Sequence, residues 1–343
     1  MSVTSSIPKQ HFKILDLLRG IAALSVVLFH FSGSALPTIK PNSVTDFFSF
    51  GKLGVQVFFV ISGFIIPYSM YASGYKISGA WNFIIKRLAR IGPPSWIALI
   101  FLFIIYYGAI AMNGRPIEGM PWPGTDWKTI LANLTYSYSF LNAGLYNEVY
   151  WTLEIEFQYY VIIAFLLPFI ITSSSNMLYL AAVFLALNAT WFVHNNEVLF
   201  FRDNIFFLMG ILLFLFKTKH ITGAYFLIFS IVMAIICYWQ QGFENTIAAL
   251  IAWFAISYIA FQNPVTTFLG TISYSLYITH HATGITAEYI LRNLTGMSPP
   301  EPLRTIMVFV YAGCAIVFAW LFYLAVEKPF IRFSHIISSK IKK

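Results

Sequence analysis

The stretch KILDLLRGIAALSVVLFHFSG, residues 13–33, is long enough and apolar enough to form a membrane-spanning helix. A helix needs about 20 mainly apolar residues to cross the hydrocarbon core of a bilayer. A basic end before an apolar run also occurs in secretory signal peptides, but no A-x-A cleavage site follows and further apolar runs do. The stretch therefore predicts a membrane protein whose first spanning helix lies at the N-terminus.

The composition of the whole chain supports this fold class. Of 343 residues, 59% are hydrophobic and only 10% are charged, whereas a soluble domain has about 25% charged residues. These values exclude a water-soluble protein and a disordered chain. The net charge of +8 does not indicate nucleic-acid binding, because the basic residues are not gathered on a soluble face. Cys237 and Cys314 lie in apolar runs and give neither a disulfide framework nor a metal-binding spacing.

Apolar runs recur along the chain and predict about ten transmembrane helices. Cytoplasmic segments of membrane proteins are enriched in Lys and Arg, and with the N-terminus inside, 14 of the 21 basic residues fall in such segments. We therefore predict an all-α polytopic membrane protein, a single domain over residues 1–343, with both termini in the cytoplasm and its longest external loop at 113–149. The expected spans lie near residues 14–33, 54–71, 93–112, 150–171, 177–193, 203–216, 222–239, 245–262, 266–286 and 304–326.

Ionisable side chains inside apolar spans are expensive to bury, so each is a candidate functional residue. Asp16 and Arg19 are spaced i, i+3 and could form a structural ion pair at the cytoplasmic boundary. His30 lies 11 residues beyond Arg19, which is about 16 Å along a helix and places His30 in the outer part of the membrane. A lone histidine in a helix most often packs through a hydrogen bond, and the alternative is a catalytic imidazole.

Two later spans also carry ionisable residues. Glu154 and Glu156 point about 200° apart on a helix, so only one of them can face a shared cavity. Glu156 is expected at a depth similar to that of His30, where a carboxylate would fix the tautomer of the imidazole, unless it hydrogen-bonds a neighbouring helix instead. His280 and His281 diverge by about 100° and are not expected to serve one site together. No HExxH motif or spaced Cys/His cluster indicates a metal site.

A basic segment follows the second span. Residues 81–96, WNFIIKRLARIGPPSW, predict a short amphipathic cytoplasmic helix that is broken at Pro93 and Pro94. Arg87 and Arg90 are spaced i, i+3 on this helix. They either anchor the chain on its cytoplasmic side or clamp the phosphates of a cytoplasmic ligand. The chain has no GxGxxG and no Walker A motif, so nothing indicates a nucleotide-binding fold.

Several of these stretches, in this order, resemble the integral-membrane acyltransferase-3 family, whose members commonly O-acylate surface carbohydrates. The four stronger stretches are LDLLRGIAALSVVLFH (15–30), GVQVFFVISGFII (54–66), FIIKRLARIGPPSW (83–96) and WTLEIEFQYY (151–160). Two weaker stretches are LGTISYSLYITHH (269–281) and EKPFIRF (327–333). The resemblance covers nearly the whole chain, and the first four stretches are specific only in combination.

The resemblance implies transfer of an acyl group, commonly acetyl, from cytoplasmic acyl-CoA to a hydroxyl of an extracytoplasmic or lipid-linked carbohydrate. It implies acyl-CoA as a co-substrate, no tightly bound cofactor, and a place in the bacterial inner membrane. The candidate site residues are His30 and Glu156 for catalysis, Arg19, Arg87 and Arg90 for the acyl-CoA phosphates, and Asp16 and His280 as secondary positions.

The spacing in the first span fits this chemistry. A pantetheine arm of about sixteen bonds is roughly 20 Å long, and Arg19 and His30 are about 16 Å apart on a helix. His30 could act as a general base on the acceptor hydroxyl or accept the acyl group itself. From composition alone, a transporter or flippase for a glycan or lipid-linked intermediate fits as well, although no inverted repeat is visible in the sequence.

Overall fold

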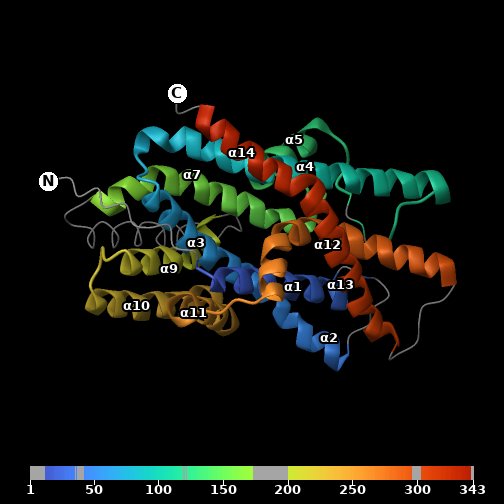
Figure 1. Cartoon of the computed structure of the whole chain (residues 1–343). Helices are drawn as coiled ribbons and strands as arrows, with labels where there is room; N and C mark the ends of the chain where they lie inside the picture. The colour runs from blue at the N-terminus through green and yellow to red at the C-terminus, as the bar shows by residue number, and fades with distance from the viewer. Residues whose placement is uncertain are drawn as a thin grey trace. The chain divides into compact units, whose positions relative to one another are not determined.

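The computed structural model describes residues 12–34, 36, 42–118, 120, 122–172, 200–295 and 303–340. Every regular element in these ranges is a helix, so the prediction of an all-α chain is confirmed for them (Figure 1). The elements are α1 (Ile14–Phe29), η1 (His30–Ser34), α2 (Ser43–Phe48), η2 (Ser49–Leu53), α3 (Gly54–Ala72), η3 (Ile77–Gly79), α4 (Ala80–Asn113), α5 (Trp127–Thr135), α6 (Tyr138–Leu141), η4 (Glu148–Tyr150), α7 (Trp151–Thr172), α9 (Phe200–Lys217), α10 (Gly223–Gln241), α11 (Phe243–Tyr258), α12 (Pro264–Thr295), α13 (Leu303–Phe322), η5 (Tyr323–Glu327) and α14 (Lys328–Lys340).

The protein is an integral membrane protein, because six helical segments in the described ranges are long and apolar enough to cross a bilayer. Helices also cover nine of the ten predicted spans, and the remaining one, 177–193, lies outside the described residues. Among the helices that match predicted spans, α11 is apolar but shorter than the other spanning segments. The count of ten spans and the orientation of the termini stay predictions.

The chain divides into two compact units that interleave along the sequence. The first unit contains the described parts of Met1–Leu18, Val55–Ile85 and Glu154–Asn263. The second contains the described parts of Arg19–Gly54, Lys86–Leu153 and Pro264–Lys343. Of the sequence-predicted site residues, Glu156 and Asp16 belong to the first unit, and the others belong to the second.

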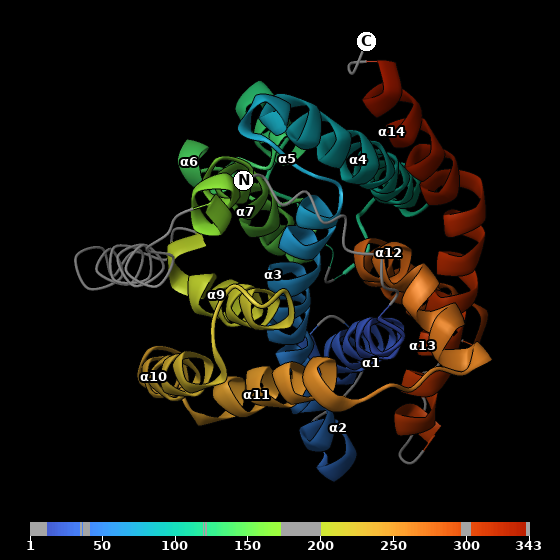
Figure 2. The same cartoon turned by 60° about the vertical axis from the view of Figure 1, so that its left-hand side comes forward.

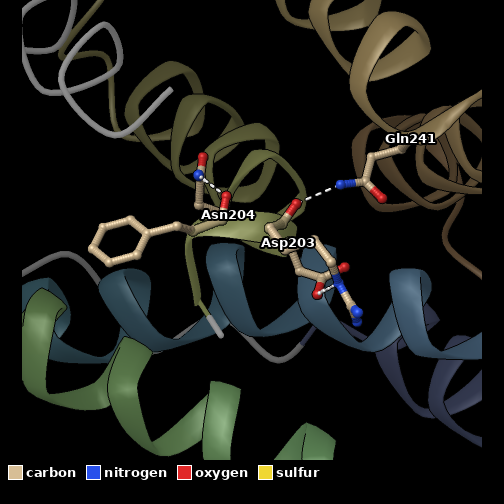
Figure 3. A network of polar contacts seen from close by, with 5 residues as sticks. Asp203, Asn204 and Gln241 are labelled. Carbon is tan, nitrogen blue, oxygen red and sulfur yellow. Dashed lines mark hydrogen bonds and ion pairs between the residues drawn. The ribbon is translucent and has the colours of Figure 1, made fainter. Parts of the chain in front are cut away.

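Three helices of the first unit, α9, α10 and α11, pack against one another (Figure 2), and aromatic rings stack between them. The Phe226 ring stacks on Phe216 with centroids 3.9 Å apart and on Trp253 at 4.9 Å. A polar network lies at the start of α9, where Arg202 pairs with Asp203 at 3.0 Å and its carbonyl accepts a hydrogen bond from Gln241 (Figure 3). The buried Asp203 carboxylate and the Arg202 carbonyl therefore have partners within the first unit, and we interpret these contacts as structural.

Helix α4 does not break at Pro93 and Pro94, which corrects the prediction of a separate short helix before them. The two prolines remove the amide donors that would bond the carbonyls one turn earlier. Side chains supply donors to the carbonyls next to this gap. Ser95 Oγ donates to Gly92 O at 2.8 Å, and Tyr274 OH donates to Ile91 O at 2.6 Å. Such side-chain and neighbouring-helix bonds are what allow proline inside membrane helices.

The segment after α4, which the sequence predicts as the external loop 113–149, folds back and contacts the middle of α4. Trp96 Nε1 donates to Leu134 O at 2.9 Å, and the hydroxyls of Ser95 and Tyr136 lie 2.6 Å apart. Tyr150 OH, just before α7, donates to Ser95 O at 2.7 Å. Helix α5 and the start of α7 therefore lie beside the middle of the 34-residue α4 (Figure 1).

Glycines bring α1 and α12 of the second unit into close contact. A Cβ on Gly20 would lie 2.7 Å from Leu269 Cβ, and a Cβ on Gly284 would lie 2.2 Å from the Phe31 ring. Both distances are too short for real side chains, so neither position accepts a larger residue without movement. Small residues at helix contacts let backbones approach closely in membranes. The two contacts hold the first span against α12 near both of its ends.

Candidate functional site

Three histidine rings meet in the second unit where α1 ends against α12. The His30 ring centroid lies 5.2 Å from that of His280 and 5.7 Å from that of His281. The two α12 rings are themselves 6.4 Å apart. His280 and His281 are both almost completely buried. The expectation that adjacent histidines could not share a site is therefore wrong, because His30 contacts both of them.

The local backbone explains how the His30 ring comes close to the rings of both His280 and His281. Helix α1 ends at Phe29, and the next turn, His30–Ser34, is π-helical with a kink at Gly33. A π-turn is wider than an α-turn and often occurs at functional sites. It turns the end of the first span toward α12, where Gly284 leaves room for the Phe31 ring. The His30 ring then lies next to both side chains, and the three ring centroids form a triangle.

The hydrogen bonds of His280 define which of its nitrogens carries a proton. Its Nδ1 lies 2.8 Å from Tyr277 O and 3.2 Å from Leu276 O. A carbonyl oxygen can only accept, so Nδ1 is the protonated nitrogen and Nε2 of the neutral ring keeps its lone pair. Nε2 is buried and has no hydrogen-bond partner among the described residues. The site therefore contains an imidazole nitrogen that is free to accept a proton.

Glu148 brings a carboxylate to this cluster. Its Oε2 lies 3.7 Å from His281 Nε2, and its side chain is 57% exposed. The residue begins η4, which Asn147 holds against α12 by donating to Ile278 O at 2.9 Å. Sequence reasoning missed both Glu148 and His281. The adjacent-histidine pattern could have indicated His281, but no pattern pointed to Glu148.

Two of the predicted phosphate-binding arginines lie together in the second unit. Arg19 on α1 and Arg90 on α4 both act electrostatically on the carboxylate of Glu327. That carboxylate accepts bonds from Ser275 Oγ at 2.6 Å and from Ser275 N at 3.2 Å. Arg87 lies one turn before Arg90 on α4. Sequence reasoning missed Glu327 as a site residue, although it begins the EKPFIRF stretch.

Glu156 has partners within the first unit. Its Oε1 accepts a bond from Ser62 Oγ at 3.2 Å and from Tyr160 OH at 2.5 Å. The neighbouring Gly63 allows close packing, since a Cβ there would lie 2.2 Å from Phe207 O. The carboxylate is thus held by two hydroxyls. Its catalytic role stays a prediction, and so does the structural ion pair between Asp16 and Arg19. Among the described residues, no group of His, Cys, Asp and Glu is arranged to hold a metal ion.

Comparison with known proteins gives the site a chemical context. The acyltransferase-3 profile, described as an acyltransferase domain, matches residues 12–324. A Staphylococcus aureus (strain COL) protein, whose name marks it as an inferred O-acetyltransferase, is 24% identical over 366 residues, covering 92% of this chain and 56% of that protein. The peptidoglycan O-acetyltransferase of Listeria monocytogenes is 28% identical over 182 residues, covering 50% of this chain and 26% of that protein.

The match to these relatives is partial on their side. An O-acetyltransferase of Staphylococcus aureus (strain NCTC 8325) is 26% identical over 163 residues, which cover 46% of this chain and 25% of that protein. The chain spans about half the length of the curated relatives that match it over most of its residues. No solved structure matches the chain.

Proposed function

The chain belongs to the acyltransferase-3 family and is an acyltransferase, and from this premise we propose that it moves an acetyl group from cytoplasmic acetyl-CoA to a hydroxyl of a carbohydrate. The acceptor is a cell-surface or lipid-linked glycan, and the membrane is the bacterial plasma membrane. Support for the acetyl group and for a glycan acceptor comes from the relatives, which are named as O-acetyltransferases, one of them for peptidoglycan.

The observation that carries the proposal is the imidazole cluster around His30. Acyl transfer to a hydroxyl needs a group that removes the hydroxyl proton as its oxygen attacks the acyl carbon. His30 lies at the end of the first span and touches His280 and His281. Most of the surrounding helix is apolar, so burying three ionisable rings together is costly. Ionisable groups placed at such a cost mark a candidate functional site.

The arginines supply a place for the donor. Coenzyme A carries phosphates at one end and the thioester at the other, and guanidinium groups bind phosphates through paired hydrogen bonds. Arg19 on α1 and Arg90 on α4 both act electrostatically on the Glu327 carboxylate, and we assign the coenzyme A phosphates to these two guanidinium groups. Arg19 is about 16 Å along the helix from His30, within the reach of an extended pantetheine arm of roughly 20 Å.

The reaction then balances as follows. The acceptor oxygen forms a bond to the acetyl carbon, and the bond from that carbon to sulfur breaks. The hydroxyl proton passes to an imidazole and then to the leaving sulfur, so coenzyme A departs as a thiol. His30 acts as this base, or it holds the acetyl group between two such steps. The products are the acetyl ester and free coenzyme A.

The test is a donor assay on the full chain in lipid nanodiscs. Acetyl-CoA consumption is followed by free-thiol release and by transfer of radiolabelled acetyl to peptidoglycan fragments. His30→Ala should reduce both by about 10²–10⁴-fold, with an unchanged melting temperature. His220→Gln, which changes a histidine of the first unit, is the control and should keep the wild-type rate. Near-normal transfer by His30→Ala would remove His30 from the mechanism.

A further inference from the structure

We propose that His280, through Nε2, is the group that takes the proton from the acceptor hydroxyl. This inference rests on the proposed acetyl transfer and, of the two roles given there to His30, keeps the second, in which His30 holds the acetyl group while His280 acts as the base. Three observations carry it, namely the position of the ring beside His30, the defined tautomer, and the unpartnered buried nitrogen. Each concerns residues of the second unit.

The position of the ring is fixed by packing. His280 lies 5.2 Å from His30 between ring centroids and is fully buried. The Phe31 and Tyr277 rings lie at 6.1 and 6.0 Å from it. These neighbours pack around the ring, and the Nδ1 bonds to Tyr277 O and Leu276 O orient it. A base held in this way needs little reorganisation when the proton moves.

The tautomer is the one that a base requires. The two carbonyls of α12 bind the Nδ1 proton and leave the lone pair on Nε2. A buried acceptor without a donor is destabilising, so such an atom calls for an explanation. A substrate hydroxyl would provide the missing donor. The His30 ring, whose centroid lies 5.2 Å from that of His280, is where the acetyl group is expected.

Neighbouring groups on other elements do not supply that donor. Glu148, on η4, lies near His281 rather than near a nitrogen of His280. On α12 itself, Thr279 donates its hydroxyl proton to Ser275 O at 2.7 Å. His280 is therefore the imidazole of the cluster whose bonds to carbonyl oxygens place a proton on Nδ1, which leaves Nε2 as the acceptor.

The proton transfer completes the balanced reaction. The hydroxyl oxygen bonds to the acetyl carbon while its proton moves to His280 Nε2. The bond from the acetyl carbon to a His30 nitrogen breaks. That nitrogen took the acetyl group from coenzyme A in the preceding step, in which the sulfur left as a thiol with the imidazole proton. His280 then returns the acceptor's proton to the His30 nitrogen. No other reactant is required.

His280→Asn is the most informative substitution. The asparagine amide can replace the Nδ1 proton donor toward Tyr277 O, but it provides no base at the position of Nε2. His280→Gln is the second variant, with its amide near Nε2. The control is Thr279→Val, which alters the adjacent buried residue. All three are compared as full chains in nanodiscs.

The assay measures acetyl-CoA thiol release stimulated by two small alcohols, ethanol and 2,2,2-trifluoroethanol. A base helps a weakly acidic hydroxyl more than an acidic one. We expect His280→Asn to lower the ethanol-dependent rate by about 10²-fold and the trifluoroethanol-dependent rate clearly less, while Thr279→Val keeps both. An unchanged ethanol-dependent rate, or equal losses with both alcohols, would overturn the assignment.

A spectroscopic measurement tests the same point without turnover. In chain labelled with ¹⁵N-histidine, the signals that disappear in both His280 variants should show a protonated Nδ1 and a bare Nε2. A protonated Nε2 in the resting protein would overturn the inference. A His30→Ala chain with normal transfer, or a wild-type chain that releases no thiol, would instead count against the proposed function itself.

Discussion

Gly284→Ala should damage catalysis through geometry alone, because the residue touches no proposed substrate. An added Cβ would lie 2.2 Å from Phe31 Cε1 and 2.4 Å from Cζ. Ordinary van der Waals contact begins at 3.4 Å, so the ring must retreat by about 1.2 Å, on the scale at which misplacement costs about 10²-fold in rate. Phe31 is fully buried, and it adjoins His30 in the same π-helical turn. The displacement should therefore open the contact between His30 and His280.

The expected result is a 10- to 100-fold slower release of thiol from acetyl-CoA, following the rough scale for a displacement of about 1 Å. Overpacking should also lower the free energy of unfolding by about 1–3 kcal/mol, against a helix-propensity gain of about 1 kcal/mol from replacing glycine. Gly313→Ala on α13, where a Cβ meets nothing within 4 Å, isolates that gain and is the matched control.

A second substitution tests the cause. Phe31→Leu removes the ring atoms Cε1 and Cζ that the new methyl group would strike. The double variant should therefore recover activity and melting temperature relative to Gly284→Ala alone. The reasoning is refuted if Gly284→Ala matches Gly313→Ala in both rate and stability. It is also refuted if Phe31→Leu fails to improve the Gly284→Ala chain.

Three further predictions concern other parts of the second unit. Arg90→Ala should weaken acetyl-CoA binding several-fold, and Arg90→Lys should weaken it less, because lysine keeps the positive charge but cannot form the paired phosphate bonds of a guanidinium. Isothermal titration with coenzyme A measures this affinity. Wild-type affinity in both variants would show that Arg90 only anchors the chain. Asp126 caps α5, and its bonds from Thr129 Oγ1 and N hold the pKa of its carboxyl below the ordinary value, so the stabilisation is present above the unfolded-state pKa and is lost as pH falls through the lower folded-state pKa. Asp126→Ala should therefore lower the melting temperature at pH 7 but not at pH 2, and the same loss at both would contradict this reading of the cap. Helix α5 buries Thr129 and Asn133 and exposes Trp127 and Leu131, an arrangement suited to lipid, so in a chain without Cys237 and Cys314, Leu131→Cys should react with a membrane-impermeant maleimide more slowly than Thr125→Cys; equal rates would place α5 in water.

Sequence alone was sufficient for the fold class and for most helices. A run of about 20 apolar residues in lipid can satisfy its backbone hydrogen bonds as a helix. The span that contains Arg19 and His30 therefore followed from composition and length. The same reasoning failed at Pro93 and Pro94, because the donors that sustain α4 there include Tyr274, from a helix far along the chain.

The candidate site was only partly visible in the sequence. His30, Arg19 and Arg90 were recognisable because charge in an apolar span is costly and because their motifs resemble a family. Glu327 and Glu148 were not, since their partners lie on other elements. His281 was set aside because ideal helix geometry separates adjacent side chains by about 100°, whereas in the structure the His30 ring lies next to both of them.

What the sequence determined, then, is that the chain spans a membrane as helices and which ionisable residues lie within those helices. These properties depend on local composition, which each segment carries by itself. Tertiary structure alone decided which of those residues meet, because contact depends on a π-turn at His30, on the space left by Gly284, and on a segment that folds back beside α4. It also decided which nitrogen of His280 is free, because neighbouring backbone carbonyls hold the proton on the other one.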